Sequence, residues 1–170
     1  CAAVLGHVDI AIALLNKGVK HKGCTDACIN RATLQQAYDG ENVLHAAVTA
    51  AFPRQHAFSA PMRLYAHQVA AVQLVHAVLA HDGGRSLHRR NHEGYTAFHN
   101  ACEIGNWHVL QQMLIFGGWD YLNTNLPDDE NEDDEDDLQM IPSMIARQQG
   151  HSCLARWLEL VKTEEWCQME

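Results

Sequence analysis

Apolar residues recur at helical spacing in four segments of the chain. In the first, residues 8–16, Ile10, Leu14 and Leu15 are spaced to lie on one face of a helix. A second, longer segment begins at residue 62 or 66 and ends at residue 81. Its apolar stripe consists of Val69, Val72, Val75, Val78 and Leu79. Both segments are therefore predicted to be amphipathic α-helices.

The other two stripes lie in the second half of the chain. One of them consists of Val109, Leu110, Met113 and Leu114. The other consists of Leu154, Trp157, Leu158 and Val161, which occupy positions i, i+3, i+4 and i+7. Glycine and proline residues separate these segments from one another. The pattern predicts an all-α protein built from short helices.

Two stretches of the chain repeat one motif. Residues 40–47 read GENVLHAA, and residues 94–102 read GYTAFHNAC. The second stretch continues through Gly105 to the apolar stripe at 109–114. After the first stripe, Gly18 is the expected end of the helix, because glycine adopts the left-handed backbone of a helix terminus at little cost.

These residues resemble the ankyrin repeat, whose motif reads Gly-x-Thr-Pro-Leu-His-x-Ala-Ala and continues with Gly-His, an apolar pair and Gly. An ankyrin repeat has about 33 residues and stacks on its neighbours, because it cannot bury its apolar face alone. The resemblance implies a single domain, an all-α ankyrin-repeat solenoid of about four repeats with the first truncated. The repeats are expected near residues 1–22, 37–84, 91–122 and 138–162.

The chain departs from the ankyrin motif at several positions. The Thr-Pro pair reads Asn42-Val43 in one repeat, and the motif histidine is Met144 in the last repeat. The aromatic residues of the segment 49–65 either fold back over the flank of the solenoid or form a second docking surface. Three insertions are expected in all, at residues 20–36, 49–65 and 124–137.

The resemblance also implies where a partner would bind. In ankyrin repeats a hairpin finger precedes two antiparallel helices, and partners bind the concave side formed by fingers and inner helices. The variable positions of that side are Tyr38, Asp39, Glu41, Thr49, Ala50, His92, Glu93, Tyr95, Glu103, Ile104, Gln148 and Gln149. Tyr95 and Trp119 are the favoured anchors, because exposed aromatic side chains often anchor interfaces. The alternative for Trp119 is packing beneath the loop that follows it.

The formal net charge of −9 comes from one segment. Of the 21 acidic residues, nine lie in residues 128–137, Asp133 and Asp134 among them, and the other 12 are balanced by 12 Lys and Arg residues. A near-neutral body without a basic face argues against nucleic-acid binding. The acidic segment is either a solvated insertion or a site that attracts a basic segment of a partner protein. It lacks the glycine and the spacing of a calcium-binding EF-hand loop.

The sequence gives no indication of catalysis or of a cofactor. The nearest approach to a metal site is His21, Cys24 and Cys28, for which tetrahedral zinc would need a fourth ligand. His45 and His99 belong to the repeat motif, where the resemblance implies that the ring hydrogen-bonds between neighbouring loops. No metalloprotease-type histidine pair, phosphate-binding loop or nucleophile elbow occurs in the sequence. The chain is therefore predicted not to be an enzyme and to hold no metal.

The six cysteines are irregularly spaced, and Cys102 and Cys153 are predicted to occupy packing positions in helices. This pattern favours free thiols and a reducing compartment, either the cytosol or the nucleus. No apolar run approaches the roughly 18 residues that a membrane span requires. The chain begins at Cys1, in the middle of a predicted repeat, so it is expected to be a piece of a longer protein.

Together these patterns predict a non-catalytic protein that binds a partner protein, either as a scaffold or by masking the partner. Two alternatives stay open. The first is an accessory domain of a larger enzyme or channel. The second is an inhibitor similar to the IκB group, whose ankyrin arrays cover a transcription factor.

Overall fold

The computed structural model describes residues 8–20, 39–49, 61–123 and 141–168. These residues are mostly helical and contain no β-strand, which confirms the all-α prediction for this part of the chain. The α-helices are α1 (Val8–Lys20), α3 (Val43–Thr49), α4 (Pro61–Asp82), α5 (Ala97–Ile104), α6 (Trp107–Ile115), α7 (Pro142–Gln148) and α8 (Ser152–Gln168). Two 3₁₀-helices, η1 (Arg85–His88) and η2 (Gly118–Asn123), follow α4 and α6.

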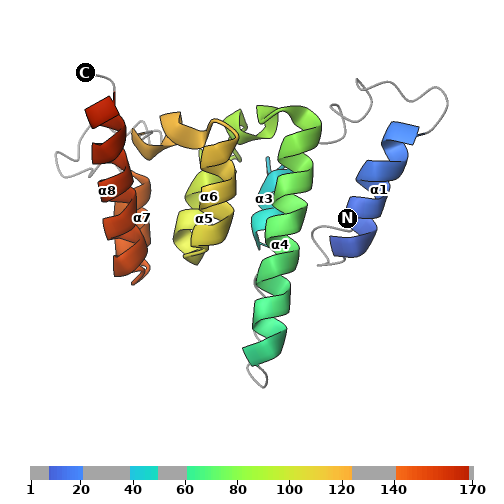
Figure 1. The fold of residues 1–170 in the computed structure, drawn as a ribbon, viewed down its shortest axis with the longest axis horizontal. Helices are drawn as coiled ribbons and strands as arrows, with labels where there is room; N and C mark the ends of the chain where they lie inside the picture. Colours follow the sequence, from blue (N-terminus) through green and yellow to red (C-terminus); the bar gives the residue numbers. More distant parts are fainter. Residues whose placement is uncertain (1–7, 21–38, 50–60, 124–140, 169–170) are drawn as a thin grey trace.

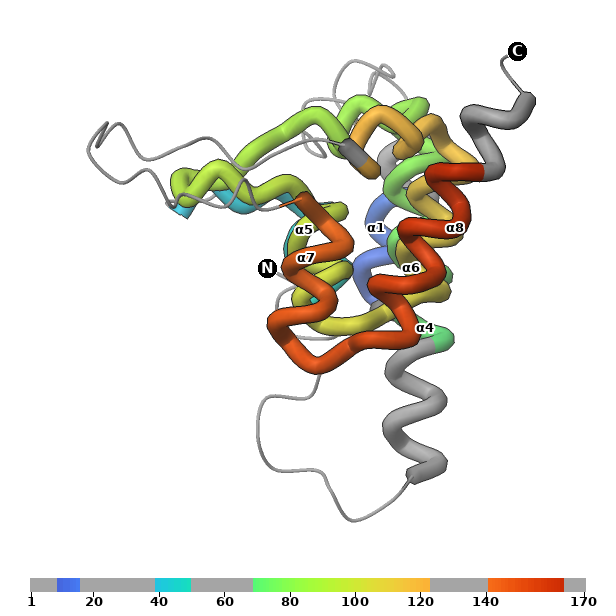
Figure 2. Tube along the Cα trace, turned by 90° about the vertical axis from the view of Figure 1, so that its left-hand side faces the viewer, coloured from blue at the N-terminus to red at the C-terminus, as the bar shows by residue number. Residues whose placement is uncertain are grey.

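The helices stand side by side in the order of the sequence, from α1 at one end to α8 at the other (Figure 1). They form three pairs that pack internally, α3 with α4, α5 with α6, and α7 with α8. Viewed from the end, α5 and α7 lie in one layer, whereas α4, α6 and α8 lie in the other (Figure 2). Successive pairs contact each other within a layer, α3 against α5, α5 against α7, and α4 against α6.

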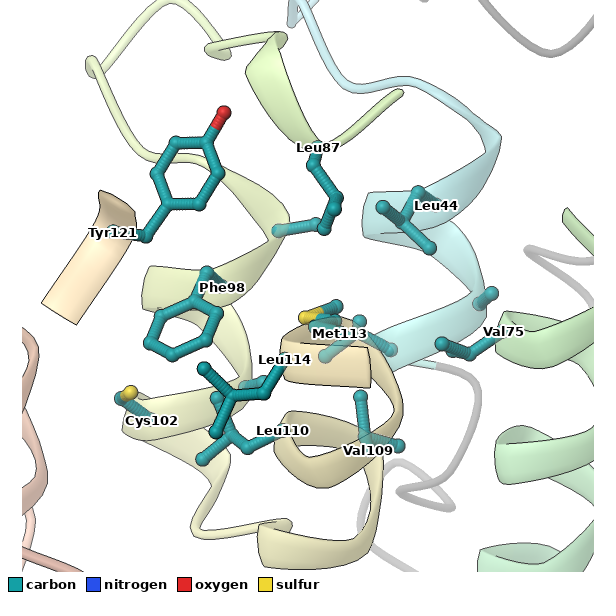
Figure 3. Packing of buried hydrophobic residues seen from close by; sticks show 14 of the residues in the cluster. Leu44, Val75, Leu87, Phe98, Cys102, Val109, Leu110, Met113, Leu114 and Tyr121 are labelled. Atoms are coloured by element: carbon teal, nitrogen blue, oxygen red, sulfur yellow. The ribbon is translucent and has the colours of Figure 1, made fainter. Parts of the chain in front are cut away.

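The core lies between the two layers and between successive pairs. Phe98 of α5 and Met113 of α6 are fully buried and lie near Leu44 of α3 (Figure 3). Leu87 of η1 and Tyr121 of η2 cover this cluster from the side of the connections, and the Tyr121 ring stacks on Phe98 with 6.1 Å between centroids. Burial of such large apolar side chains is the main stabilising contribution to a fold of this kind.

We call the first helix of each pair (α3, α5 and α7) inner and the second (α4, α6 and α8) outer. The apolar stripes of the outer helices α6 and α8 are confirmed. On α6, Val109, Leu110 and Met113 are fully buried, and Leu114 is nearly so. On α8, Leu154 and Leu158 are buried, whereas Trp157 and Val161 are partly buried against the core. Each stripe faces the short inner helix of its own pair, as the spacing predicts.

The predicted stripe of α1 is wrong in part. Ile10 is 54% exposed and Leu14 is 60% exposed, whereas Ala11 is buried and Leu15 is partly buried against the core. The reason is that α1 packs against α4 through the face that carries Ala11 and Leu15, which are four residues apart. Gly18, expected to end this helix, lies inside it.

On α4 the stripe is correct from Val75 onward and wrong at Val69. Val75, Val78 and Leu79 are fully buried, but Val69 is 39% exposed. The cause is the spacing of the stripe, because residues three apart are turned by about 60° relative to one another on an α-helix. Val69 is two such steps before Val75, so it points away from the face on which Ala71 and Val75 are fully buried.

The predicted insertions are only partly described. Residues 124–137 lie outside the described part of the chain, as do most of 20–36 and 49–65. The last five residues of 49–65 belong to α4, which begins at Pro61. Among the helices that the structure describes, none combines the length and the apolar character needed to cross a lipid bilayer.

Candidate functional site

A tight turn, residues 90–96, leads into α5. Its ends are joined by an antiparallel bridge between Arg90 and Thr96 and by a hydrogen bond of 2.8 Å from the Asn91 amide to the Tyr95 carbonyl. The Asn91 side chain shapes the turn, because its oxygen accepts from the amides of Glu93 and Tyr95 at 3.1 and 2.8 Å. His92 and Glu93 therefore lie exposed at the tip of the turn.

A second turn, before α3, lies directly beside the first. The amide of His92 donates to the Asp39 carbonyl at 2.9 Å, and the Asp39 carboxylate accepts from the Glu41 amide at 3.1 Å. Gly40 makes this approach possible, because it has φ +80 and a Cβ there would lie 2.7 Å from the His92 amide nitrogen and from its ring. The two turns thus form a continuous edge of the molecule.

Histidine side chains fix the spacing of successive helix pairs. The His45 ring on α3 is fully buried, and its Nε2 lies 3.1 Å from the Tyr95 carbonyl of the next turn. The His151 ring, between α7 and α8, makes a different contact with the preceding pair, where its Nε2 lies 3.1 Å from the Glu103 carbonyl on α5. These bonds tie each pair to the backbone of its neighbour and hold the turns in register.

The two turns and the end of α5 form one surface, which we name the turn face. Its residues are Asp39, Glu41, His92, Glu93, Tyr95, Glu103 and Ile104. Tyr95 is half-buried, and its ring packs edge-on against His99 at 6.0 Å. Burial, and then the charges of Glu103 and Glu93, raise the pKa of the Tyr95 phenol. The carboxylates of Glu93 and Glu103 therefore lie close enough to act on the same aromatic side chain.

The turn face is acidic in its own right. It carries the four carboxylates of Asp39, Glu41, Glu93 and Glu103, three of which belong to exposed residues. The nearby Arg90 guanidinium donates to the Gly94 carbonyl at 2.9 Å and supports the turn from within. The acidity predicted for residues 128–137 thus has a counterpart on the described part of the chain.

The structure brings together seven of the predicted partner-binding residues on the turn face. Asp39, His92, Glu93 and Glu103 are exposed, and Glu41, Tyr95 and Ile104 are half-buried. Of the other positions, Gln148 and Gln149 are exposed at the end of α7, and the Thr49 hydroxyl donates to carbonyls of its own helix. Tyr38, Ala50, Asp133 and Asp134 lie outside the described residues.

Trp119, the other favoured anchor, lies on a different element from the residues of the turn face. It lies on η2, which packs against α6 and α7, and it is 38% exposed. The alternative placement of Trp119 beneath the following loop is not tested, because that loop lies outside the described part of the chain.

An open groove of about 440 Å³ lies between the α5–α6 turn and the α7–α8 turn, and the sequence did not predict it. Trp107, which is 42% exposed, packs edge-on against Trp157 at 5.7 Å along this groove. Gly105, His151 and Cys153 also line it. The available signal was Trp107 itself, a large apolar residue at the start of α6 and outside the apolar stripe.

The two described cysteines occupy different environments. Cys102 is fully buried, and burial strongly raises the pKa of its thiol, as expected for a packing residue. The packing position predicted for Cys153 is wrong, because this residue is exposed. It is the second residue of α8, ahead of the stripe that begins at Leu154, and it lies on the groove instead of the core.

Metal ligands are not assembled in the described residues, where no three His, Cys, Asp or Glu side chains lie close enough together to hold an ion. The candidate metal site of His21, Cys24 and Cys28 lies outside the described residues.

In comparisons with known proteins, no protein-family model matches the chain, and no curated protein matches it at a significant level. Function is therefore inferred from the residues and their geometry.

Proposed function

We propose that the chain is an ankyrin-type solenoid that binds another protein through the turn face. The observation that carries this proposal is the linked pair of turns, in which the His92 amide bonds to the Asp39 carbonyl and His45 bonds to the Tyr95 carbonyl. The repeated motif at 40–47 and 94–102 supports the assignment, because both copies begin at a turn and continue into an inner helix.

A rigid edge of this kind suits protein recognition. Backbone hydrogen bonds and buried histidines fix the turns before binding, so little conformational entropy is lost when a partner docks. Tyr95 supplies an amphipathic aromatic anchor of the type that is enriched at interfaces. Around it, Glu93 and Glu103 supply charged groups that give orientation and specificity.

The partner that fits this surface is a protein with a basic segment. The carboxylates of the turn face would attract Lys and Arg side chains and repel the phosphates of a nucleic acid. Residues 128–137 would add nine further carboxylates and raise the association rate. The exposed thiol of Cys153 supports the proposed reducing compartment, the cytosol or the nucleus.

The proposal is tested by capturing partners from a native lysate with wild type and with the double variant Glu93→Gln/Glu103→Gln. We expect the variant to lose most of the partner that wild type captures, and this loss to shrink at high salt, where charges are screened. The control is Asp9→Asn/Glu159→Gln, which removes two exposed carboxylates on α1 and α8. Glu159 pairs with Arg147 at 2.6 Å, but an exposed ion pair of this kind contributes little to stability.

The control should retain the partner, because its charges lie away from the turn face. Circular dichroism confirms that both variants stay folded. An equal loss of partner in the two variants would show that net charge, and not the turn face, controls binding. Unchanged capture by Glu93→Gln/Glu103→Gln would remove the proposed site.

A further inference from the structure

His45 and His99 occupy matching positions, but the residues that cap them differ. At His99, the ring Nδ1 lies 2.8 Å from the Thr96 hydroxyl oxygen and 3.3 Å from the Thr96 amide nitrogen. At His45, the same atom lies 2.8 Å from the Asn42 side-chain oxygen and 3.3 Å from the Asn42 amide nitrogen. The two sites are alike in geometry and in burial, since both rings are fully buried.

The chemical difference lies in what the capping group can donate. The Thr96 hydroxyl carries a proton, so it donates to a neutral His99 ring, and it can also accept from a charged one. The oxygen of an Asn amide only accepts. In the same geometry, the two rings therefore face capping groups with different hydrogen-bonding capacity.

The orientation of the Asn42 amide is set by its other bonds. Its oxygen accepts from the amides of Leu44 and His45 at 2.9 and 3.1 Å, and its nitrogen donates to the Ser86 carbonyl at 3.0 Å. Exchanging the amide oxygen and nitrogen would place donor against donor and acceptor against acceptor at these three contacts. The atom facing His45 Nδ1 is thus an oxygen.

A neutral His45 ring cannot satisfy both of its oxygen neighbours. The Tyr95 carbonyl, 3.1 Å from Nε2, also only accepts. With the proton on Nε2, the ring donates to the Tyr95 carbonyl and Nδ1 accepts from the Asn42 amide at 3.3 Å, but the Nδ1 lone pair also faces the Asn42 oxygen at 2.8 Å. With the proton on Nδ1, the Nε2 lone pair faces the Tyr95 carbonyl. Only the imidazolium, with a proton on each nitrogen, donates to both.

We propose that Asn42 adapts His45 to take up a proton in mildly acidic conditions, so that the charged ring donates to both oxygens and keeps the two turns linked. The protonation of His45 would depend on Asn42 in this way whether or not the turn face binds a partner. A threonine at position 42 would instead favour the neutral ring, because its hydroxyl would donate to Nδ1.

The groups around His45 determine the pH at which its ring takes up a proton. Burial lowers the pKa of His45 below its ordinary value of 6.5, whereas the Tyr95 carbonyl and the charge of Asp39 oppose this change. Asp82 of α4 is occupied by the amides of Gly84 and Ser86. The other titratable groups on the described parts of helices that pack against α3 are His76 and His81 on α4, Arg85 and His88 on η1, and His99, Cys102 and Glu103 on α5. The turn that Nε2 faces adds Arg90, His92, Glu93 and Tyr95.

The sign of the effect on stability follows from the lowered pKa. The fold favours the neutral ring, so the contribution of His45 to stability is present above pH 6.5 and is lost as the pH falls through the folded pKa. Asn42 reduces this loss relative to threonine. We therefore expect the melting temperature of Asn42→Thr, taken relative to wild type at the same pH, to be higher at pH 7.5 than at pH 5, in addition to a pH-independent cost from the lost bond to the Ser86 carbonyl.

The test follows the ¹⁵N resonances of the His45 ring between pH 8 and pH 5 in the full chain and in two variants, Asn42→Thr and Asn42→Asp. Both variants lose the bond to the Ser86 carbonyl, so they are matched for that effect. We expect the titration midpoint to fall by about 0.5 to 1 pH unit with threonine and to rise with aspartate. A midpoint that is unchanged or higher with threonine would overturn the proposal.

A second measurement covers the case in which Asn42→Thr does not fold. In wild type below the His45 midpoint, the Nδ1 proton should give a slowly exchanging resonance with a through-bond coupling to the Asn42 side chain. Absence of that resonance in the titrated, folded chain would contradict the proposed bond. Spectra of His45→Gln and His99→Gln assign the two rings.

Discussion

Gly40 and His92 show how single residues set the register of neighbouring turns. Gly40 has a left-handed backbone, and the His92 backbone and ring lie where its side chain would be. The contact accompanies the hydrogen bond from His92 to Asp39, so close approach and backbone pairing depend on the same glycine. Gly83 has a similar backbone, with φ +63, but nothing lies within 4 Å of the position that its Cβ would take.

Gly40→Ala is predicted to lower the free energy of unfolding by about 3 kcal/mol, through left-handed strain plus the clash with His92. Gly83→Ala, the matched control, should cost about 1 kcal/mol from strain alone. Urea unfolding followed by circular dichroism measures both values. Equal costs for the two variants would mean that the turns at Gly40 and His92 do not meet as described.

The two described cysteines differ in accessibility, which predicts different reactivity. A thiol reagent such as dithionitrobenzoate should modify Cys153 in the native chain at least about tenfold faster than Cys102, because Cys102 is buried with a raised pKa. Comparison of wild type with Cys153→Ser and Cys102→Ser separates these sites from the other four cysteines. Loss of a fast-reacting thiol in Cys102→Ser would contradict the prediction.

The first turn of α6 is stabilised by a side-chain cap. Asn106 caps α6, where its side-chain oxygen accepts from the Val109 amide at 3.3 Å. Its side-chain nitrogen is buried without a hydrogen-bond partner, so Asn is not the ideal cap at this position. A smaller residue that only presents a hydroxyl should serve about as well.

Asn106→Ala is therefore predicted to lower the free energy of unfolding by about 1 kcal/mol, the usual cost of losing a helix cap. Asn106→Ser should stay within about 0.5 kcal/mol of wild type, because serine retains an acceptor and removes the unpartnered amide nitrogen. Thermal and urea unfolding decide the outcome. A serine variant as unstable as the alanine variant would show that the cap does not stabilise α6.

The helix stripes were predictable from sequence where a short outer helix faces its own inner helix. This holds for α6 and α8, whose apolar spacing alone defines the buried face. The prediction fails for α1, because the position of α4 decides whether the face of Ile10 or the face of Ala11 is buried. Cys153 and the groove beside it were also missed, since Trp107 and Trp157 come together only when helix pairs stack.

On the scale of the whole molecule, the proximity of the turn-face residues could be predicted from the sequence, whereas the groove beside Trp107 could not. The residues of the turn face come from two copies of one motif, so their proximity follows from stacking the copies. The acidic residues of the turn face are visible in the sequence, but the denser acidic segment 128–137 was the one predicted to attract a basic partner. The effect of Asn42 on His45 required the orientation of an amide, which only contacts with Leu44 and Ser86 define.

Site-specific photo-crosslinking tests the central claim most directly. A benzoylphenylalanine is placed at His92 or Glu93 on the turn face, and in separate variants at Ile115 or Leu160, which are 71% and 53% exposed on α6 and α8. After irradiation in lysate, we predict that the two turn-face positions crosslink the same partner protein and that the two outer-helix positions do not. A partner that crosslinks from positions 115 and 160 but not from 92 and 93 would contradict the account.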